Sequence, residues 1–151
     1  MKKVVFDLPI YTYQIDFAGH VSNIVYVQWM EIGRSRLLEE AGLPVHVLVE
    51  QGVIPVLAGT EISYRKPLRL GDRVRVEVWL SSLGAASAGI ELRFYDNGGE
   101  LAASGSHRGA FIDARTRRPL RLSPEMRDAF EPFVEAPLSR RRSVTEGGAP
   151  R

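Results

Sequence analysis

The sequence predicts an α+β domain in which one antiparallel sheet of five strands curls round one long central helix. Two observations carry this prediction. A single long helical repeat occurs near the amino end, and the segments after it alternate apolar and polar residues, as half-buried strands do. A chain of 151 residues suits one domain, which at this size buries about two-thirds of the surface that its unfolded form exposes. We therefore expect one domain over residues 1–135.

The first expected element is a strand. Val4–Tyr13 is rich in β-branched and aromatic residues, which favour strands. Pro9 lies within this segment and cannot donate a backbone hydrogen bond, so an edge position or a bulge is expected. The strand is expected to end shortly before Asp16.

The second expected element is the long central helix. Ile24–Ala41 repeats apolar residues at three- and four-residue steps, which predicts an amphipathic helix of about five turns. Ser22 or Asn23 can cap its start, and Gly42 is a typical residue for its end. The segment before the helix is therefore a loop that leads into free backbone amides.

The rest of the chain is mostly strand, with residues of alternating polarity and with turn residues between the strands. The expected elements are a short helical segment at Val45–Glu50, strands at Pro55–Tyr64, Arg73–Leu80, Ile90–Tyr95 and Leu101–Asp113, and a terminal helix from the Ser123 cap to Phe133.

Composition excludes several kinds of protein. The chain has no cysteine, which rules out disulfides, thiolate metal sites and a cysteine nucleophile. Its formal charge of +2 is too small to indicate a nucleic-acid partner. It has no signal-peptide pattern and no run of about 18 apolar residues, so we expect no stable membrane insertion and a cytoplasmic location.

Residues 136–151 have few bulky apolar side chains, and this composition predicts a flexible C-terminal tail. The run Arg140–Arg142 allows contact with a membrane surface or a polyphosphate, but it is also typical of a solvated chain end.

The loop before the long helix concentrates chemically active side chains. Asp16 and His20 are four residues apart with Gly19 between them, and Asn23 stands at the helix start. A carboxylate and an imidazole can activate water, and free helix amides can stabilise an oxyanion. The same residues also occur in ordinary turns and caps, because aspartate before glycine is a common turn former.

The pattern Asp16-Phe-Ala-Gly-His-Val-Ser-Asn23 with Tyr26, Trp29 and Glu31, followed by Ser63-Tyr-Arg-Lys-Pro67 and Leu70-Gly-Asp72, resembles the 4-hydroxybenzoyl-CoA thioesterase-like branch of the hotdog-fold acyl-CoA thioesterases. The resemblance implies a homodimer or homotetramer with active sites between protomers. It also implies hydrolysis of an acyl-CoA to a free acid and coenzyme A, without metal or organic cofactor.

The resemblance gives Asp16 the role of catalytic carboxylate, either as a nucleophile through a mixed anhydride or as a general base on water. The backbone amide of Asn23 is then the expected oxyanion donor. His20 can orient Asp16, share a proton with it or help to bind the carbonyl; it can also be purely structural.

Further residues are candidates for substrate binding. Tyr26 lies on the apolar stripe of the helix, so core packing competes with a ligand role, and Glu31 lies off that stripe. The resemblance places one strand near a partner's catalytic loop. The candidates on and after that strand are Thr60, Glu61 and Ser63, with Arg65 and Lys66 as possible contacts of coenzyme A phosphates.

We expect no metal, because His46 and His107 lack partners at metal-binding spacing and no paired histidine motif accompanies Asp16, His20 and Glu31. Two other functions stay open. A hotdog enoyl-CoA hydratase would add water without releasing thiol, and a non-catalytic acyl-CoA-binding dimer would bind without turnover. Acyl length, aromatic or aliphatic preference, and carrier-protein or coenzyme A recognition are not fixed by the sequence.

Overall fold

The computed structural model describes residues 1–135, so the tail expected at 136–151 lies outside the described residues. The elements follow the expected order. They are β1 (Val4–Pro9), the 3-10 turn η1 (Thr12–Gln14), α1 (Asn23–Glu40), α2 (Val45–Glu50), β2 (Val53–Tyr64), β3 (Arg73–Leu83), β4 (Ser87–Tyr95), β5 (Leu101–Asp113), α3 (Pro124–Phe130) and the 3-10 turn η2 (Glu131–Phe133).

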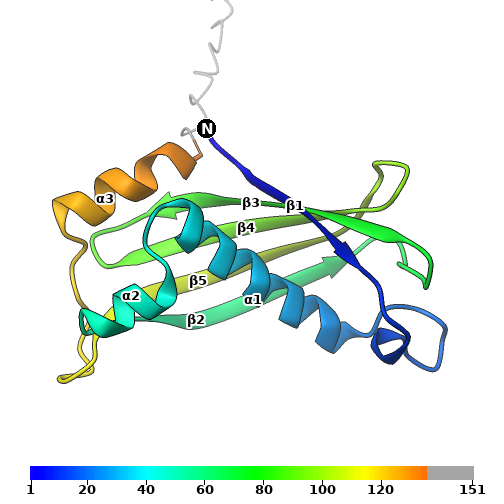
Figure 1. Ribbon diagram of the computed structural model, residues 1–151, viewed down its shortest axis with the longest axis horizontal. Helices are drawn as coiled ribbons and strands as arrows, with labels where there is room; N and C mark the ends of the chain where they lie inside the picture. Colours follow the sequence, from blue (N-terminus) through cyan, green and yellow to red (C-terminus); the bar gives the residue numbers. More distant parts are fainter. Residues whose placement is uncertain (136–151) are drawn as a thin grey trace, which may run out of the picture.

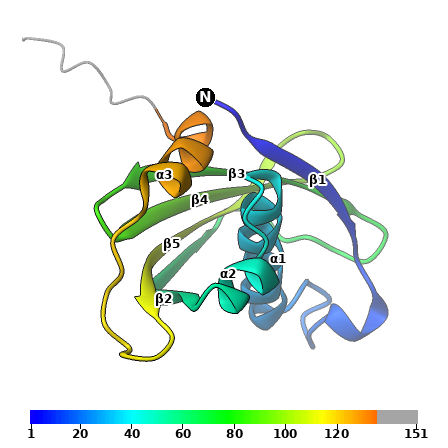
Figure 2. The same ribbon diagram turned by 60° about the vertical axis from the view of Figure 1, so that its left-hand side comes forward.

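The five strands form one antiparallel sheet in the order β1-β3-β4-β5-β2. The sheet curves round α1, which runs along its concave face, while α3 covers one end (Figures 1 and 2). The predicted α+β arrangement is therefore confirmed. The two edge strands are β1, with 6 residues, and β2, with 12 residues.

The helix lies close to the sheet because its inner face combines large apolar side chains with one glycine. Trp29, Met30 and Leu37 are almost fully buried. Gly33 faces β3 and β4, where an added Cβ would lie 2.6 Å from Leu92 Cδ2 and 3.0 Å from Val78 Cγ2. A side chain at this position would push the helix from the sheet, since packed cores tolerate little added volume.

The first strand is shorter than predicted. β1 ends at Pro9, which pairs with Arg73 at the edge of the sheet, and the chain then turns through η1. Gln14 is 7% exposed, and its Oε1 accepts a hydrogen bond from the Tyr11 N–H at 2.8 Å. This local bond replaces a strand ladder, so the prediction of a strand through Tyr13 was wrong, whereas the edge position expected from Pro9 is confirmed.

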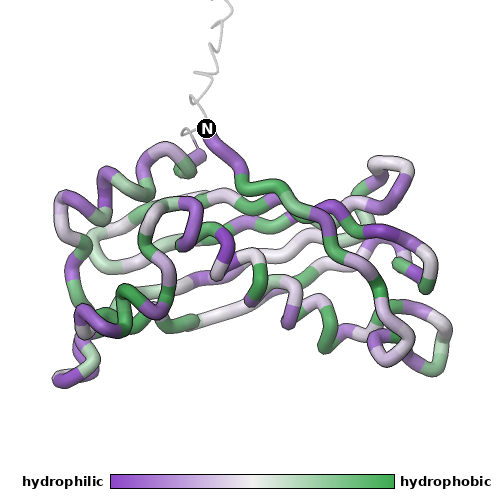
Figure 3. The backbone as a smooth tube through the Cα atoms, viewed as in Figure 1, coloured by the Kyte–Doolittle hydropathy of each residue, from purple (hydrophilic) through white to green (hydrophobic). Residues whose placement is uncertain are grey.

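Hydropathy follows this layout. Figure 3 shows a hydrophobic stretch at the start of the edge strand β1, which Asp7 interrupts, and the turn after β5, which holds Arg115, Arg117 and Arg118, is strongly hydrophilic. Among the described helices, none is both long enough and apolar enough to cross a membrane.

Candidate functional site

A cavity of about 300 Å³ opens where the loop before α1 meets the end of β2. These segments lie at the right-hand end of the molecule in Figure 1. The cavity is lined by Asp16, His20, Val21, Asn23, Tyr26, Tyr64, Arg65, Lys66 and Pro67. One chain therefore brings the three residues predicted to be catalytic together with three of the residues predicted to bind substrate.

Asp16 opens a tight turn that fixes its carboxylate through one oxygen. Its Oδ1 accepts hydrogen bonds from the N–H groups of Ala18 at 2.9 Å and His20 at 3.2 Å. Its own N–H donates to the carbonyl of His20 at 2.8 Å, and Gly19 closes the turn at φ +78°. Among residues 1–135, no hydrogen bond or ion pair uses Asp16 Oδ2, so that oxygen is free to accept one.

The start of α1 supplies backbone donors. Ser22 is the N-cap residue, but its side chain makes no capping bond, contrary to one of the two expected caps. Within the described part of the chain, the N–H groups of Asn23 and Ile24 have no acceptor. Such amides lie at the positive end of the helix dipole, so the Asn23 N–H beside the cavity suits a developing negative charge.

His20 lines the same cavity, but its ring makes no hydrogen bond to Asp16 among residues 1–135. The contacts between the two residues run through the His20 backbone instead. The imidazole therefore stands near the carboxylate without being paired to it.

Tyr26 belongs both to the core and to the cavity wall. It is 2% exposed, and its ring meets that of Tyr64 edge-on with centroids 5.2 Å apart. Burial, with a smaller effect of Tyr64, raises the pKa of Tyr26 to about 12, so its hydroxyl stays neutral at physiological pH. Tyr26 is thus packed in the core and also lines the cavity, so its position is compatible with both core packing and a contact to a ligand.

The two neighbouring cations at the cavity differ in their partners. Lys66 Nζ lies 2.5 Å from Asp96 Oδ2 and 2.7 Å from Glu100 Oε2. Hydrogen bonding to these two carboxylates raises the pKa of Lys66 above its usual range. No ion pair of Arg65 is found within residues 1–135.

Four predicted substrate-binding residues lie outside the cavity lining. Glu31 is two turns along α1 from Asn23, about 12 Å by helix rise, and pairs with Arg34 at 2.7 Å. The other three, Thr60, Glu61 and Ser63, are exposed on β2.

Thr60 is bonded within its own chain. Its Oγ1 lies 3.0 Å from Nδ1 of His107, which is 1% exposed on the neighbouring strand β5. Burial, followed by the charge of Arg34, lowers the pKa of His107, so this imidazole is neutral. Among the described residues its Nε2 has no hydrogen-bond partner. A buried neutral ring between sheet and helix indicates a structural role.

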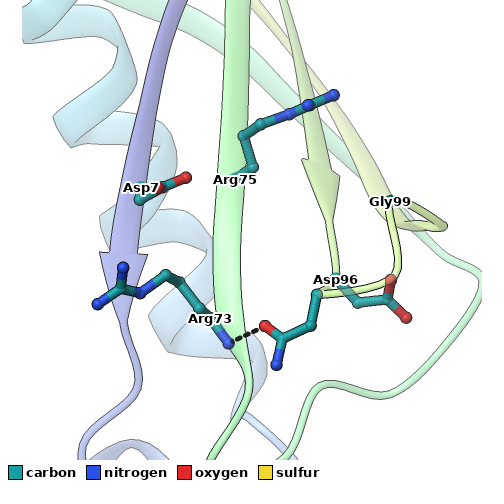
Figure 4. Close-up of a pocket in the computed structure, with 6 residues that line it drawn as sticks. Asp7, Arg73, Arg75, Asp96 and Gly99 are labelled. Carbon is teal, nitrogen blue, oxygen red and sulfur yellow. Dashed lines mark hydrogen bonds between the residues drawn. The ribbon is translucent and has the colours of Figure 1, made fainter.

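A second cavity, of about 280 Å³, is lined by residues of β1, β3 and the turn after β4 (Figure 4). It is lined by Asp7, Arg73, Arg75, Asp96, Asn97 and Gly99. Figure 4 shows Arg73 reaching toward β1 and Arg75 away from it, so the two guanidinium groups do not converge. With acids between them, they are poorly arranged to hold one phosphate.

The sequence prediction missed Val21, Tyr64 and Pro67 as parts of the cavity wall. Tyr64 carried a usable signal, because it directly precedes the basic pair at the end of a predicted strand. Over residues 1–135, no group of three His, Cys, Asp or Glu side chains is close enough to hold a metal ion.

Comparison with known proteins adds to this geometry. A family model described as the thioesterase-like superfamily matches residues 10–130. YneP of Bacillus subtilis, to which acyl-CoA thioesterase activity is attributed, is 26% identical over 121 residues, covering 78% of this chain and 88% of that protein.

Two solved structures are similar. A thioesterase of Thermus thermophilus, complexed with coenzyme A and Zn, is 29% identical with a TM-score of 0.72, covering 85% of this chain and 92% of that one. DHNA-CoA thioesterase of Staphylococcus aureus has a TM-score of 0.82 at 21% identity, covering 87% and 91%. At this low sequence identity, the second similarity shows a shared fold alone.

Proposed function

The chain belongs to the thioesterase-like superfamily and is a thioester hydrolase with the hotdog fold, and we propose that Asp16 is the carboxylate with which it hydrolyses an acyl-CoA. The observation that carries this proposal is the Asp16 turn. Its Oδ1 is held by two backbone N–H groups, its Oδ2 has no hydrogen bond among residues 1–135, and the residue lines the cavity.

The thioester carbonyl is proposed to lie between Asp16 and the start of α1. As a nucleophile attacks the carbonyl carbon, the oxygen gains negative charge, and the Asn23 N–H can donate to it. A donor of this kind is worth about 3 kcal/mol of transition-state stabilisation at comparable sites. The thiolate of coenzyme A then leaves as the carbonyl re-forms.

Asp16 can act in two ways. As a nucleophile, Oδ2 attacks the carbonyl and forms a mixed anhydride, which water then hydrolyses. As a general base, Oδ2 takes a proton from a water molecule, which attacks the carbonyl directly. His20 borders the same space and is proposed to support either course by orienting the water or binding the carbonyl oxygen.

Arg65 and Lys66 at the cavity border are proposed to face the phosphates of coenzyme A, and Tyr26 to contact the reacting end of the substrate. The coenzyme A complex of the Thermus thermophilus relative supports an acyl-CoA substrate here. We propose that the enzyme acts on activated acyl groups in the cytoplasm.

We propose a homodimer, or a homotetramer of such dimers, joined along β2. This strand pairs with β5 on one side, and no described residue pairs with its other side. A long open edge is a template for another strand, whereas β1 at the opposite edge is short and ends in Pro9. In such a dimer, Thr60, Glu61, Ser63 and Glu31 would lie close to the partner's site, and light scattering should give at least twice 16.8 kDa.

The test is thiol release from short, long and aromatic acyl-CoAs, followed with a thiol-trapping reagent that this cysteine-free chain cannot consume. We expect saturable release, whose rates rank the acyl preference. A folded protein that releases no thiol from any substrate would contradict the proposal. Water addition to an enoyl-CoA would then indicate the hydratase, and binding alone the non-catalytic dimer.

A further inference from the structure

The entrance of the active-site cavity carries a small cluster of three charges, Lys66, Asp96 and Glu100, here termed the Lys66 clamp. The Lys66 ammonium contacts both carboxylates, from the loop after β2 to the turn between β4 and β5. One positive and two negative charges leave the clamp with a net charge of −1. The positive charge of Lys66 next to the cavity is therefore more than offset by the two carboxylates that it contacts.

The two carboxylates of the clamp are held very differently. Asp96 Oδ1 accepts hydrogen bonds from the N–H groups of Gly98 at 3.0 Å and Glu100 at 2.9 Å, and its side chain is 10% exposed. The Glu100 side chain is 71% exposed, and its carboxylate has no partner other than Lys66 among residues 1–135. Asp96 is a fixed anchor, whereas Glu100 is a loosely held second anion.

The charges of Lys66 and Asp96 persist at neutral pH. Hydrogen bonding from Lys66 lowers the pKa of Asp96, and the same contact raises the pKa of Lys66. An anion that arrives at the cavity entrance therefore meets a Lys66 ammonium that is already paired with carboxylates. Arg65, next in sequence to Lys66, has no such competitor in the described part of the chain.

We propose that Glu100 is an affinity-setting residue that competes with the phosphates of the substrate carrier for Lys66 and so weakens the binding of the nucleotide part of coenzyme A. This inference rests on the proposed function, because it takes the carrier to be coenzyme A. Arg65 then supplies most of the attraction for phosphate in the native protein, and Lys66 contributes more when Glu100 is removed, because only Asp96 then offsets its charge.

The experiment measures binding of coenzyme A itself, without an acyl group, by calorimetry at low ionic strength. Glu100→Gln removes one negative charge and keeps the size of the side chain. We expect it to tighten binding about threefold to tenfold, since a unit charge within several ångströms of a phosphate acts at this scale when salt is low. The gain should shrink in high salt.

Three controls isolate the contact from bulk charge. Glu50→Gln changes the net charge equally but lies on α2, at the other end of the molecule in Figure 1, and should leave affinity unchanged. Lys66→Gln in the Glu100→Gln background should cancel the gain. Pantetheine, which has no phosphate, should bind both proteins equally.

Unchanged or weaker coenzyme A binding by Glu100→Gln would overturn the inference, as would the same gain in Glu50→Gln or no detectable binding by either protein. This readout does not require turnover. If Glu100→Gln binds coenzyme A more tightly but no acyl-CoA is hydrolysed, the proposed function fails while the assignment of Glu100 stands.

Discussion

The turns that begin at Asp16 and Asp96 have the same backbone hydrogen bonds, but their aspartate side chains have different neighbours. In each, the aspartate Oδ1 accepts from the N–H groups two and four residues later. Each aspartate N–H donates to the carbonyl of the fifth residue, and a glycine at the fourth position has φ of +78° or +77°. The two turns differ in Oδ2. This oxygen of Asp96 pairs with Lys66, whereas that of Asp16, a residue that lines the cavity, is unbonded among residues 1–135.

The two turns show that the turn-forming role of an aspartate is independent of what its second carboxylate oxygen contacts. An aspartate before glycine is a turn former in both places, so the structural interpretation of Asp16 is correct as far as it goes. What distinguishes Asp16 is the oxygen that the turn does not use, together with the helix amides beside it.

The largest expected effect comes from replacing each aspartate by asparagine. Asn keeps an oxygen for the turn, so Asp16→Asn should fold with little change in Tm but lose thioesterase kcat at least about a hundredfold, because an amide is neither a nucleophile nor a base. Asp96→Asn should keep kcat within about twofold of wild type, since that carboxylate faces Lys66. Thiol release and thermal melts check both; equal losses of kcat would break the comparison.

A smaller effect is expected from the matching glycines. Gly19 and Gly99 both have positive φ, and an added Cβ would meet nothing within 4 Å at either position. Gly19→Ala and Gly99→Ala should therefore each cost about 1 kcal/mol of unfolding free energy through backbone strain alone.

Only Gly19→Ala should also lower kcat, by about tenfold or more, because strain in this turn would shift the carboxylate that we propose to react. Chemical denaturation and initial rates separate the two readouts. If Gly99→Ala lowered kcat as much as Gly19→Ala does, the difference between the turns would not lie in Asp16.

The smallest effect concerns acid stability. The pKa of Asp96 is lower in the folded protein because Lys66 hydrogen bonds to it. A lowered pKa gives stability that is present above the unfolded value, about 3.9, and is lost as pH falls through the folded value. From about pH 5 downward, the Tm of Asp96→Asn, and of Lys66→Gln, should therefore fall less steeply than that of wild type. Parallel curves for all three proteins would show that the ion pair is absent in solution.

Much of the fold follows from local pattern. The helical repeat predicts α1, and alternation of apolar and polar residues predicts β3 and β4. The close approach of helix and sheet at Gly33 emerged only from the structure. Pro9 was recognised as an edge signal, but the buried Gln14 side chain that turns the chain after it was not, because its bond to Tyr11 depends on burial that no pattern displays.

The site was predictable where its residues are neighbours in sequence. Asp16, His20 and Asn23 share one loop, so their meeting needed no tertiary information. The sequence left Lys66 as either a phosphate contact or a solvated charge at a strand end. Its partners come from the turn between β4 and β5 and meet it only through strand pairing. Thr60 likewise found its partner His107 on another strand.

The most direct test of the central claim is a crystal structure of Asp16→Asn with an uncleaved acyl-CoA bound. We predict the thioester carbonyl carbon within about 3.5 Å of the side chain at position 16, with its oxygen facing the Asn23 N–H. A thioester bound in the second cavity beside Arg73, or beyond reach of position 16, would contradict the assignment of Asp16.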